Sequence, residues 1–150
     1  RARGGLDHRL RRTGFASLMV LDSSALLAIL FSESRRHAFV EAIDADPVRL
    51  LSVASLTECS IVVSSRRAAD GLRDLDQLVS RAGIQLEAVD VEQAYVARDA
   101  WQRFGKGRHP AALNFGDCFS YALAYVTGEP LLFAGRDFAM TDIAPHPASG

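Results

Sequence analysis

Short, continuous apolar runs alternate along the chain with longer segments in which apolar residues recur every three or four positions. The short runs are typical of strands buried on both faces of a parallel sheet, and the longer spacing is typical of amphipathic helices. The short runs predict strands at 18–21, 49–52, 84–89 and 131–133, with a short fifth strand at 142–144. The longer spacing, with capping residues and glycines at its ends, predicts helices at 23–31, 33–45, 55–63, 70–82, 91–104 and 115–126. Strands that alternate with helices imply an α/β fold, with a mostly parallel sheet of four or five strands flanked by helices.

The first 17 residues show neither pattern. They contain five arginines and three glycines, and the chain does not begin with Met. We expect residues 1–17 to form a flexible, Arg-rich leader, either translated from upstream of a natural start at Met19 or foreign to the natural protein. The folded domain is therefore expected to span residues 18–150.

Length and composition fit one ordinary globular domain, with 150 residues, 49% of them hydrophobic, and a net charge of −1. No apolar run approaches the roughly 20 residues that span a bilayer, and no signal-peptide cleavage site is evident. We therefore expect a cytoplasmic protein with no membrane partner. Cys59 and Cys118 lie within apolar helical patterns and are expected to be small core residues, because no spacing in the chain resembles a disulfide framework or a zinc site.

Three acidic residues stand out because each lies at the start of a predicted helix. Asp22 directly follows the first strand, Glu58 ends the string Ser55-Leu56-Thr57-Glu58, and Asp117 ends the string Asn114-Phe115-Gly116-Asp117. Each also has a purely structural explanation, Asp22 as an N-cap and the other two as members of capping boxes. Ligands of open α/β sheets bind beyond the carboxyl ends of the strands, so the alternative is that the three acids meet at one point.

Carboxylates gathered at one point repel one another unless a cation lies between them. A site of oxygen ligands without histidine or cysteine suits Mg²⁺, with Mn²⁺ as a substitute. Such a site can activate a water and stabilise the charge on a phosphodiester. The basic residues Lys106, Arg108 and His109 fill one nearby loop and are candidates for contacts with a nucleic-acid backbone. The alternative for this loop is that it is only solvated.

Three segments together resemble the PIN-domain toxins called VapC. They are Val20-Leu21-Asp22-Ser23-Ser24-Ala25-Leu26, Ser55-Leu56-Thr57-Glu58, and the block from Gly105 to Ala124 that contains Asn114-Phe115-Gly116-Asp117. The first two strings are short and common, whereas the third is long and specific. The resemblance covers about Met19 to Ala144, nearly everything except the leader.

The resemblance implies a three-layer PIN-like sandwich and a Mg²⁺-dependent endoribonuclease, the toxic half of a type II toxin–antitoxin pair. Such a toxin cuts structured RNA in tRNA or rRNA loops by means of a metal-activated water. The resemblance further implies that Asp22 and Asp117 bind the metal, that Glu58 completes the catalytic cluster, and that Ser24 orients a carboxylate or water. The implied partners are a cognate VapB-type antitoxin, the RNA substrate and a second copy of the chain in a homodimer.

One position departs from the family pattern. Many relatives carry a fourth acid just after the last long strand, where this chain has Gly135. Asp137, two residues later, and Asp142 are the candidates to replace it, with a solvated turn as the alternative for Asp137. Asp99, on the helix that carries Trp101, is expected to lie on a solvated face.

Two other enzyme classes also place an acid at the end of a strand, but they fit this chain poorly. A phosphatase of the haloacid dehalogenase type needs a second acid two residues on, where this chain has Ser24. A response-regulator receiver needs an acidic pair there and a lysine after the last strand. The remaining alternative is a PIN-like domain that no longer cuts RNA and acts as an antitoxin-binding co-repressor. Gly135, in the place of the fourth acid, is consistent with this alternative.

Overall fold

The structure is a computed structural model that describes residues 17–150, so the predicted leader lies outside the described residues except for its last position. Its centre is a four-stranded parallel sheet in the order β3-β2-β1-β4. The strands are β1 (Leu18–Leu21), β2 (Val48–Ser52), β3 (Gln85–Glu87) and β4 (Leu131–Leu132). This confirms the predicted α/β class with a parallel sheet.

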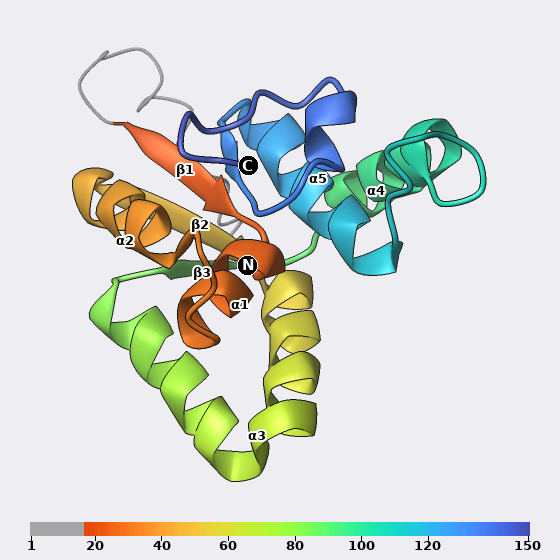
Figure 1. The fold of residues 1–150 in the computed structure, drawn as a ribbon. Coiled ribbons are helices and arrows are strands. Elements are labelled where there is room, and N and C mark those ends of the chain that lie inside the picture. The colour runs from red at the N-terminus through yellow and green to blue at the C-terminus, as the bar shows by residue number, and fades with distance from the viewer. Residues whose placement is uncertain (1–16) are drawn as a thin grey trace, which may run out of the picture.

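Among residues 17–150, five α-helices and one short 3₁₀ segment surround the sheet (Figure 1). They are α1 (Ser23–Leu30), α2 (Arg36–Ala45), α3 (Val53–Arg81), α4 (Val91–Phe104), α5 (Phe115–Thr127) and η2 (Phe138–Met140). Figure 1 shows α4 and α5 side by side, with α1, α2 and α3 grouped elsewhere around the sheet. No helix among residues 17–150 has both the length and the apolar character needed to cross a membrane.

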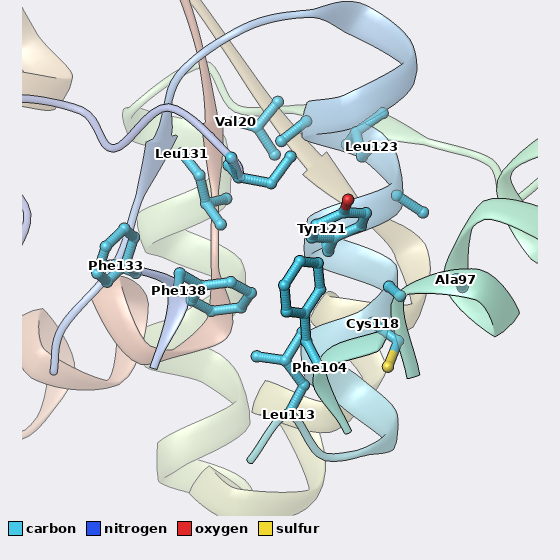
Figure 2. Close-up of a cluster of buried hydrophobic side chains, with 14 of the residues drawn as sticks. Val20, Ala97, Phe104, Leu113, Cys118, Tyr121, Leu123, Leu131, Phe133 and Phe138 are labelled. Carbon is cyan, nitrogen blue, oxygen red and sulfur yellow. The ribbon is translucent and has the colours of Figure 1, made fainter. Parts of the chain in front are cut away.

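The two faces of the sheet carry separate hydrophobic cores, because successive strand residues point to opposite faces. Val20 and Leu50 pack with α4 and α5, and Figure 2 shows this cluster around the buried rings of Phe104 and Tyr121. Met19 and neighbouring residues of the other face pack with α1, α2 and α3. Helices therefore cover both faces of the sheet, which gives the expected three layers.

The two helices predicted at 55–63 and 70–82 are present, but no loop separates them. Element α3 spans 29 residues and is divided into two helical segments at Ala68, whose φ of 50° and ψ of −137° are not helical. It also begins before Ser55, because Ser52 is its N-cap and accepts a hydrogen bond from the Ala54 N–H at 3.2 Å. The capping box predicted for Ser55 and Glu58 is therefore wrong, and Glu58 lies in the second turn of the helix.

The third and fifth predicted strands also differ from the structure. The third strand is only three residues long, and its first two side chains are exposed, so it gains little from burial. The fifth strand, predicted at 142–144, is absent from the described residues. A single parallel bridge between Leu131 and Pro145 stands in its place, and Asp142 turns to an ion pair described below.

Candidate functional site

Asp22 lies at the carboxyl end of the central strand β1 and is the N-cap of α1. Its side chain is buried, with one carboxylate oxygen accepting from the Ser24 backbone N–H at 3.0 Å. The other oxygen accepts from the Ser120 hydroxyl at 2.6 Å. Ser120 is on α5, so this bond joins segments that are 98 residues apart in sequence. Asp22 is thus both a helix cap, as its sequence context predicts, and a point where α1 meets α5.

The Ser120 hydroxyl is also 2.9 Å from the hydroxyl of Ser55 on α3. Since the Ser120 proton is directed at Asp22, Ser55 is the donor of this second bond. Both serines are fully buried. A short relay of hydroxyls therefore fixes Asp22 between α3 and α5.

Glu58 reaches the same region from α3. One of its carboxylate oxygens accepts from the Ser23 hydroxyl at 2.5 Å. The carboxylate also rests against the backbone of Gly116 at the start of α5, where a Cβ would lie 1.7 Å from Oε2 of Glu58. A side chain at position 116 would occupy the space that Glu58 uses, so the glycine makes this approach possible.

Asp117 enters from the first turn of α5, where the predicted capping box with Asn114 is confirmed. Asp117 accepts from the Asn114 backbone N–H at 2.9 Å, and the Asn114 side chain accepts from the Asp117 N–H at 2.9 Å. A helix N-terminus also favours the negative charge of this side chain. The local fold therefore holds Asp117 at the helix end that faces the other two acids.

The charges of neighbouring carboxylates contribute to raised pKa values at Asp117 and Glu58. Burial raises the pKa of Asp117 to about 7, with the charges of Asp22, Glu58 and Asp137 adding to the shift and the Asn114 N–H opposing it. Burial and the charge of Asp22 also raise the pKa of Glu58, against the lowering effect of the Ser23 hydrogen bond. No ion pair within residues 17–150 involves Asp22, Glu58 or Asp117. Within the described residues, the cluster is therefore a concentration of negative charge without a basic side chain to balance it.

The donor set of this cluster fits a hard divalent cation, because it consists of carboxylate and hydroxyl oxygens without nitrogen or sulfur. Within the described part of the chain, no three Asp, Glu, His or Cys side chains converge closely enough to hold an ion as they stand. The residues fit a metal in kind and in charge.

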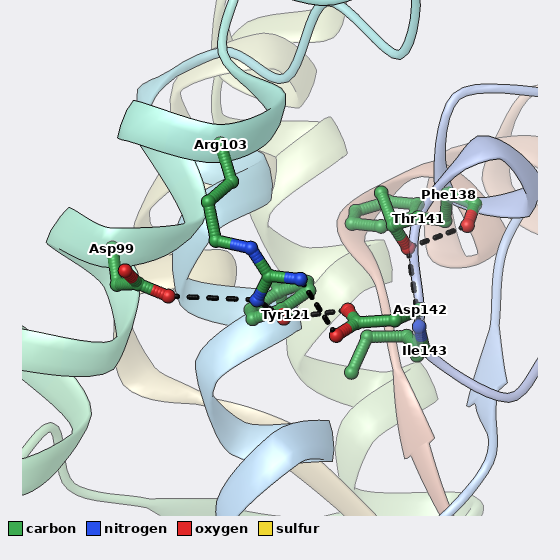
Figure 3. A network of polar contacts seen from close by, with 7 residues as sticks. All are labelled: Asp99, Arg103, Tyr121, Phe138, Thr141, Asp142 and Ile143. Carbon is green, nitrogen blue, oxygen red and sulfur yellow. Dashed lines mark hydrogen bonds and ion pairs between the residues drawn. The ribbon is translucent and has the colours of Figure 1, made fainter.

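The candidates for a fourth acid are placed differently. Asp137 is exposed at the start of η2, and its charge is among those that raise the pKa of Asp117. Asp142 instead accepts from the Tyr121 hydroxyl at 2.6 Å and pairs with Arg103 at 3.1 Å. Arg103 also pairs with Asp99 at 3.5 Å, as Figure 3 shows. Asp99 and Asp142 thus belong to a network that anchors the C-terminal segment to α4 and α5.

Ser24 contacts Asp22 through its backbone N–H, whereas its hydroxyl accepts from the Ala134 N–H at 3.0 Å. That hydroxyl ties α1 to the segment that follows β4. The hydroxyls that reach the carboxylates belong to Ser23 and Ser120, which the sequence did not single out. Their only sequence signal is position, Ser23 directly after Asp22 and Ser120 one helical turn after Asp117.

The predicted RNA-contacting loop is compact. His109 directs its Nδ1 at the Ala111 N–H at 3.0 Å and packs edge-on against Phe104, so its ring is committed within the protein. Lys106 and Arg108 are exposed. The structure therefore brings Asp22, Glu58 and Asp117 together and leaves the two basic side chains on the surface beside α4.

A groove of about 600 Å³ opens beside the acids between the first turns of α3 and the start of α5. Its walls are mostly apolar, including Ile61 and the strongly exposed Phe115, and Glu58 and Asn114 are among the residues that line it. Glu58, one acid of the cluster, is therefore accessible to a ligand from this groove.

Comparison with known proteins shows close relatives. Residues 19–144 match the family described as PIN domain. A protein named "Ribonuclease VapC" from Mycolicibacterium smegmatis is 53% identical over 126 residues, which cover 84% of this chain and 98% of that protein.

Two solved structures share the fold at low sequence identity. VapC20 of Mycobacterium tuberculosis, described as a Sarcin-Ricin loop cleaving toxin, has a TM-score of 0.66 at 17% identity, over 85% of this chain and 99% of that chain. VapBC2 from Rickettsia felis, bound to a DNA fragment from its promoter, has a TM-score of 0.69 at 10% identity, over 89% of this chain and 98% of that chain. These two likenesses concern the fold alone.

Proposed function

The chain belongs to the PIN-domain family and to its VapC group, and from that premise we propose that it is a Mg²⁺-dependent endoribonuclease, the toxin of a type II toxin–antitoxin pair. The observation that carries the proposal is that three acids from three separate segments lie near enough for the charges of Asp22 and Glu58 to raise the pKa of Asp117, without a basic partner among residues 17–150. A fold needs no such cluster for stability, because like charges brought together cost free energy. A bound divalent cation would remove that cost.

Within the proposed site, Asp22 and Asp117 hold the metal, and Glu58 completes the acidic cluster. We assign the fourth position to Asp137, because its charge acts on Asp117 whereas Asp142 is engaged by Arg103 and Tyr121. A Mg²⁺ ion held there would supply a Lewis acid to activate water and to offset the charge on the phosphodiester, and Mn²⁺ would serve in the same way.

The side chains around the acids orient them. Ser120 fixes one oxygen of Asp22 and the Ser24 N–H fixes the other, which leaves the carboxylate little freedom to rotate. Ser23 holds Glu58 in the same manner. Polar partners of this kind preserve the orientation of metal ligands and tune their basicity. We include these serines in the proposed site as positioning residues.

We propose as the substrate structured RNA cut in exposed loops, either tRNA or rRNA. The rRNA alternative draws on VapC20, which is described as cleaving the Sarcin-Ricin loop. We propose as partners a VapB-type antitoxin, following the VapBC2 complex of Rickettsia felis, and a second copy of the chain. The cytoplasm, where these RNAs occur, is the proposed place of action.

The test uses the purified chain, free of antitoxin, with total tRNA and with ribosomes, with and without Mg²⁺ or Mn²⁺. We expect metal-dependent cleavage that is lost in Asp22→Asn and in Asp117→Asn. The matched control is Asp76→Asn, which changes an exposed acid on α3. Calorimetric titration with Mn²⁺ measures binding of the ion separately from cleavage.

A protein that binds no divalent ion and leaves both RNAs intact would contradict the nuclease proposal. The second candidate, an antitoxin-binding co-repressor, rests on Gly135 in the place of an acid. It would then be supported by tighter promoter binding of the antitoxin in the presence of this chain. The two candidates therefore predict opposite results in the cleavage assay.

A further inference from the structure

The outer surface of α4 and the loop that follows it carry two arginine–aromatic pairs. The guanidinium carbon of Arg108 lies 4.3 Å from the centre of the Trp101 ring, and that of Arg98 lies 4.7 Å from the centre of the Tyr95 ring. Both rings are unusually open for their size, with 40% of Trp101 and 58% of Tyr95 exposed. We call these four residues the α4 platform.

The Trp101 ring is held in place by the backbone beneath it. A Cβ at position 105 would lie 2.8 Å from Cδ1 and 2.9 Å from Nε1 of Trp101, so the indole lies directly against Gly105. Any larger residue at 105 would displace the ring. The glycine and Arg108 together present the indole as a fixed, partly open surface.

Backbone hydrogen bonds also fix the loop that carries Arg108. The N–H groups of Arg108 and His109 both donate to the Gly105 carbonyl, at 3.0 and 3.1 Å. The Lys106 N–H donates to the Leu113 carbonyl at 2.9 Å, and Leu113 directly precedes the N-cap of α5. The platform therefore has a defined position relative to the helix that carries Asp117.

The charges of the platform have no acidic partner in the described part of the chain. Arg103, on the same helix, is paired with Asp99 and Asp142 (Figure 3). Arg98, Lys106 and Arg108, by contrast, form no ion pair with any acid of residues 17–150. Unpaired cations next to open aromatic faces suit a ligand that offers both phosphates and flat rings, which is the chemistry of single-stranded nucleic acid.

We propose that Trp101 and Arg108 form a stacking subsite for an unpaired base of the RNA, outside the carboxylate cluster, with Lys106 and Arg98 contacting the flanking phosphates. The inference rests on the proposed function, because it takes RNA as the substrate. It adds a mode of recognition: the subsite selects RNA with an unpaired base at a fixed distance from the cleaved bond. Stacking accepts all four bases, so the subsite reads strandedness rather than sequence.

Trp101 is the only tryptophan in the chain, which makes its fluorescence a direct reporter of the subsite. The experiment titrates the metal-free protein with a short 2′-O-methyl RNA, which cannot be cut, and with the same strand carrying abasic positions. We expect saturable quenching by the first strand and little quenching by the second, because the second retains the phosphates but offers no ring to stack. Cleavage of tRNA and ribosomes with Mg²⁺ is measured on the same preparation.

Variants separate stacking from charge. Arg108→Ala should weaken binding of the 2′-O-methyl strand about tenfold and lower its salt dependence by about one phosphate contact. Arg108→Lys should retain the salt dependence but not the affinity, because an ammonium cannot stack as a guanidinium does. The matched control is Arg66→Ala, because the guanidinium carbon of Arg66 lies 4.7 Å from the centre of the Phe31 ring, next to α1. This variant should change neither the affinity for the 2′-O-methyl strand nor its salt dependence.

The outcomes distinguish this inference from the proposed function. Metal-dependent cleavage without quenching would overturn the subsite and leave the nuclease intact, whereas quenching without cleavage would do the reverse. Equal quenching by the abasic strand, or by a polyglutamate peptide, would show a general anion surface and overturn the stacking subsite. Full affinity in Arg108→Lys would also overturn it.

Discussion

The contact between Gly116 and Glu58 leads to a prediction in which activity and stability are affected to very different extents. Gly116 lies within α5 and is not among the glycines with positive φ, so an alanine fits its backbone. The added Cβ would nevertheless lie 1.7 Å from Oε2, 2.3 Å from Cδ and 2.6 Å from Oε1 of Glu58. In Gly116→Ala the whole carboxylate of Glu58 must therefore move.

The structure sets the size of the effect. Restoring an ordinary carbon–oxygen contact requires a shift of about 1.5 Å, and a misplacement of about 1 Å in an active site costs about 10²-fold in rate. The loss of the bond from Ser23 to the Glu58 carboxylate costs about 1.5–3 kcal/mol. Replacing a helical glycine by alanine returns up to about 1 kcal/mol. We expect cleavage to fall about 100-fold while the free energy of unfolding falls by no more than about 2 kcal/mol.

The assay compares single-turnover cleavage of RNA at saturating Mg²⁺ with urea unfolding of the same preparations. Glu58→Ala and the double variant Gly116→Ala/Glu58→Ala complete a double-mutant cycle, which isolates the coupling between the two positions. Once Glu58 is absent, the alanine at 116 has nothing to displace. The substitution at 116 should therefore cost cleavage nothing further in the Glu58→Ala background.

Two results would refute this reasoning. Cleavage at the wild-type rate by Gly116→Ala would show that the position of Glu58 is not needed. An equal loss of rate in both backgrounds would show that the alanine acts through something other than Glu58, such as the start of α5.

Three further predictions follow from other contacts. The folded-state pKa of Asp117 is about 7 and the ordinary value is 3.8, so the folded metal-free protein retains a proton that the unfolded chain loses, and its stability falls as pH rises between these values. Asp117→Asn should therefore raise the melting temperature by a few degrees at pH 8 and not at pH 4. An equal shift at both pH values would contradict this. Ser120→Ala removes a partner of Asp22 and should weaken the apparent Mg²⁺ affinity in the cleavage assay about 10- to 100-fold, whereas an unchanged Mg²⁺ dependence would show that Asp22 needs no support. Ala68 has a φ of 50°, so Ala68→Gly should stabilise the fold by about 1 kcal/mol in urea unfolding, and a lower midpoint would contradict strain at the bend.

The sequence predicted the placement of those candidate residues that local structure determines. Asp22 follows a continuous apolar strand, and Asp117 belongs to a capping box that the structure retains. These two placements depend only on neighbouring residues, and local patterns determine such placements well.

The position of Glu58 was harder to predict because two serines compete to start its helix. Ser55 had the better capping-box spacing, but Ser52 caps the helix, and Ser55 is buried within it against Ser120. Burial against α5 decided between them, and that contact lies 65 residues away in sequence. A pattern of neighbouring residues cannot predict a contact between residues so far apart in sequence.

The serine- and arginine-rich stretch of α3 lies between the two predicted helices, and it is helical up to Ala68 instead of forming a loop. The hydroxyls of Ser64 and Ser65 both donate to the Ile61 carbonyl, at 3.1 and 2.7 Å. Hydroxyls that bond back to the preceding turn satisfy themselves within a helix and often bend it. The same residues also favour turns, so their presence alone could not show that the helix continues to a bend at Ala68.

The separation of the two cores has a consequence for the time at which the protein acquires activity. Asp22 and Glu58 are carried by helices on one face of the sheet, while Asp117 is carried by a helix on the other. The acids meet only when both layers have docked on the strands between them. A chain still emerging from the ribosome contains the first two acids long before it contains the third, and α5 must then pack before the cluster exists. The proposed RNA-cutting centre stays incomplete until α5 has been synthesised and has packed, so the ribosome that makes the protein is not exposed to a finished site before then.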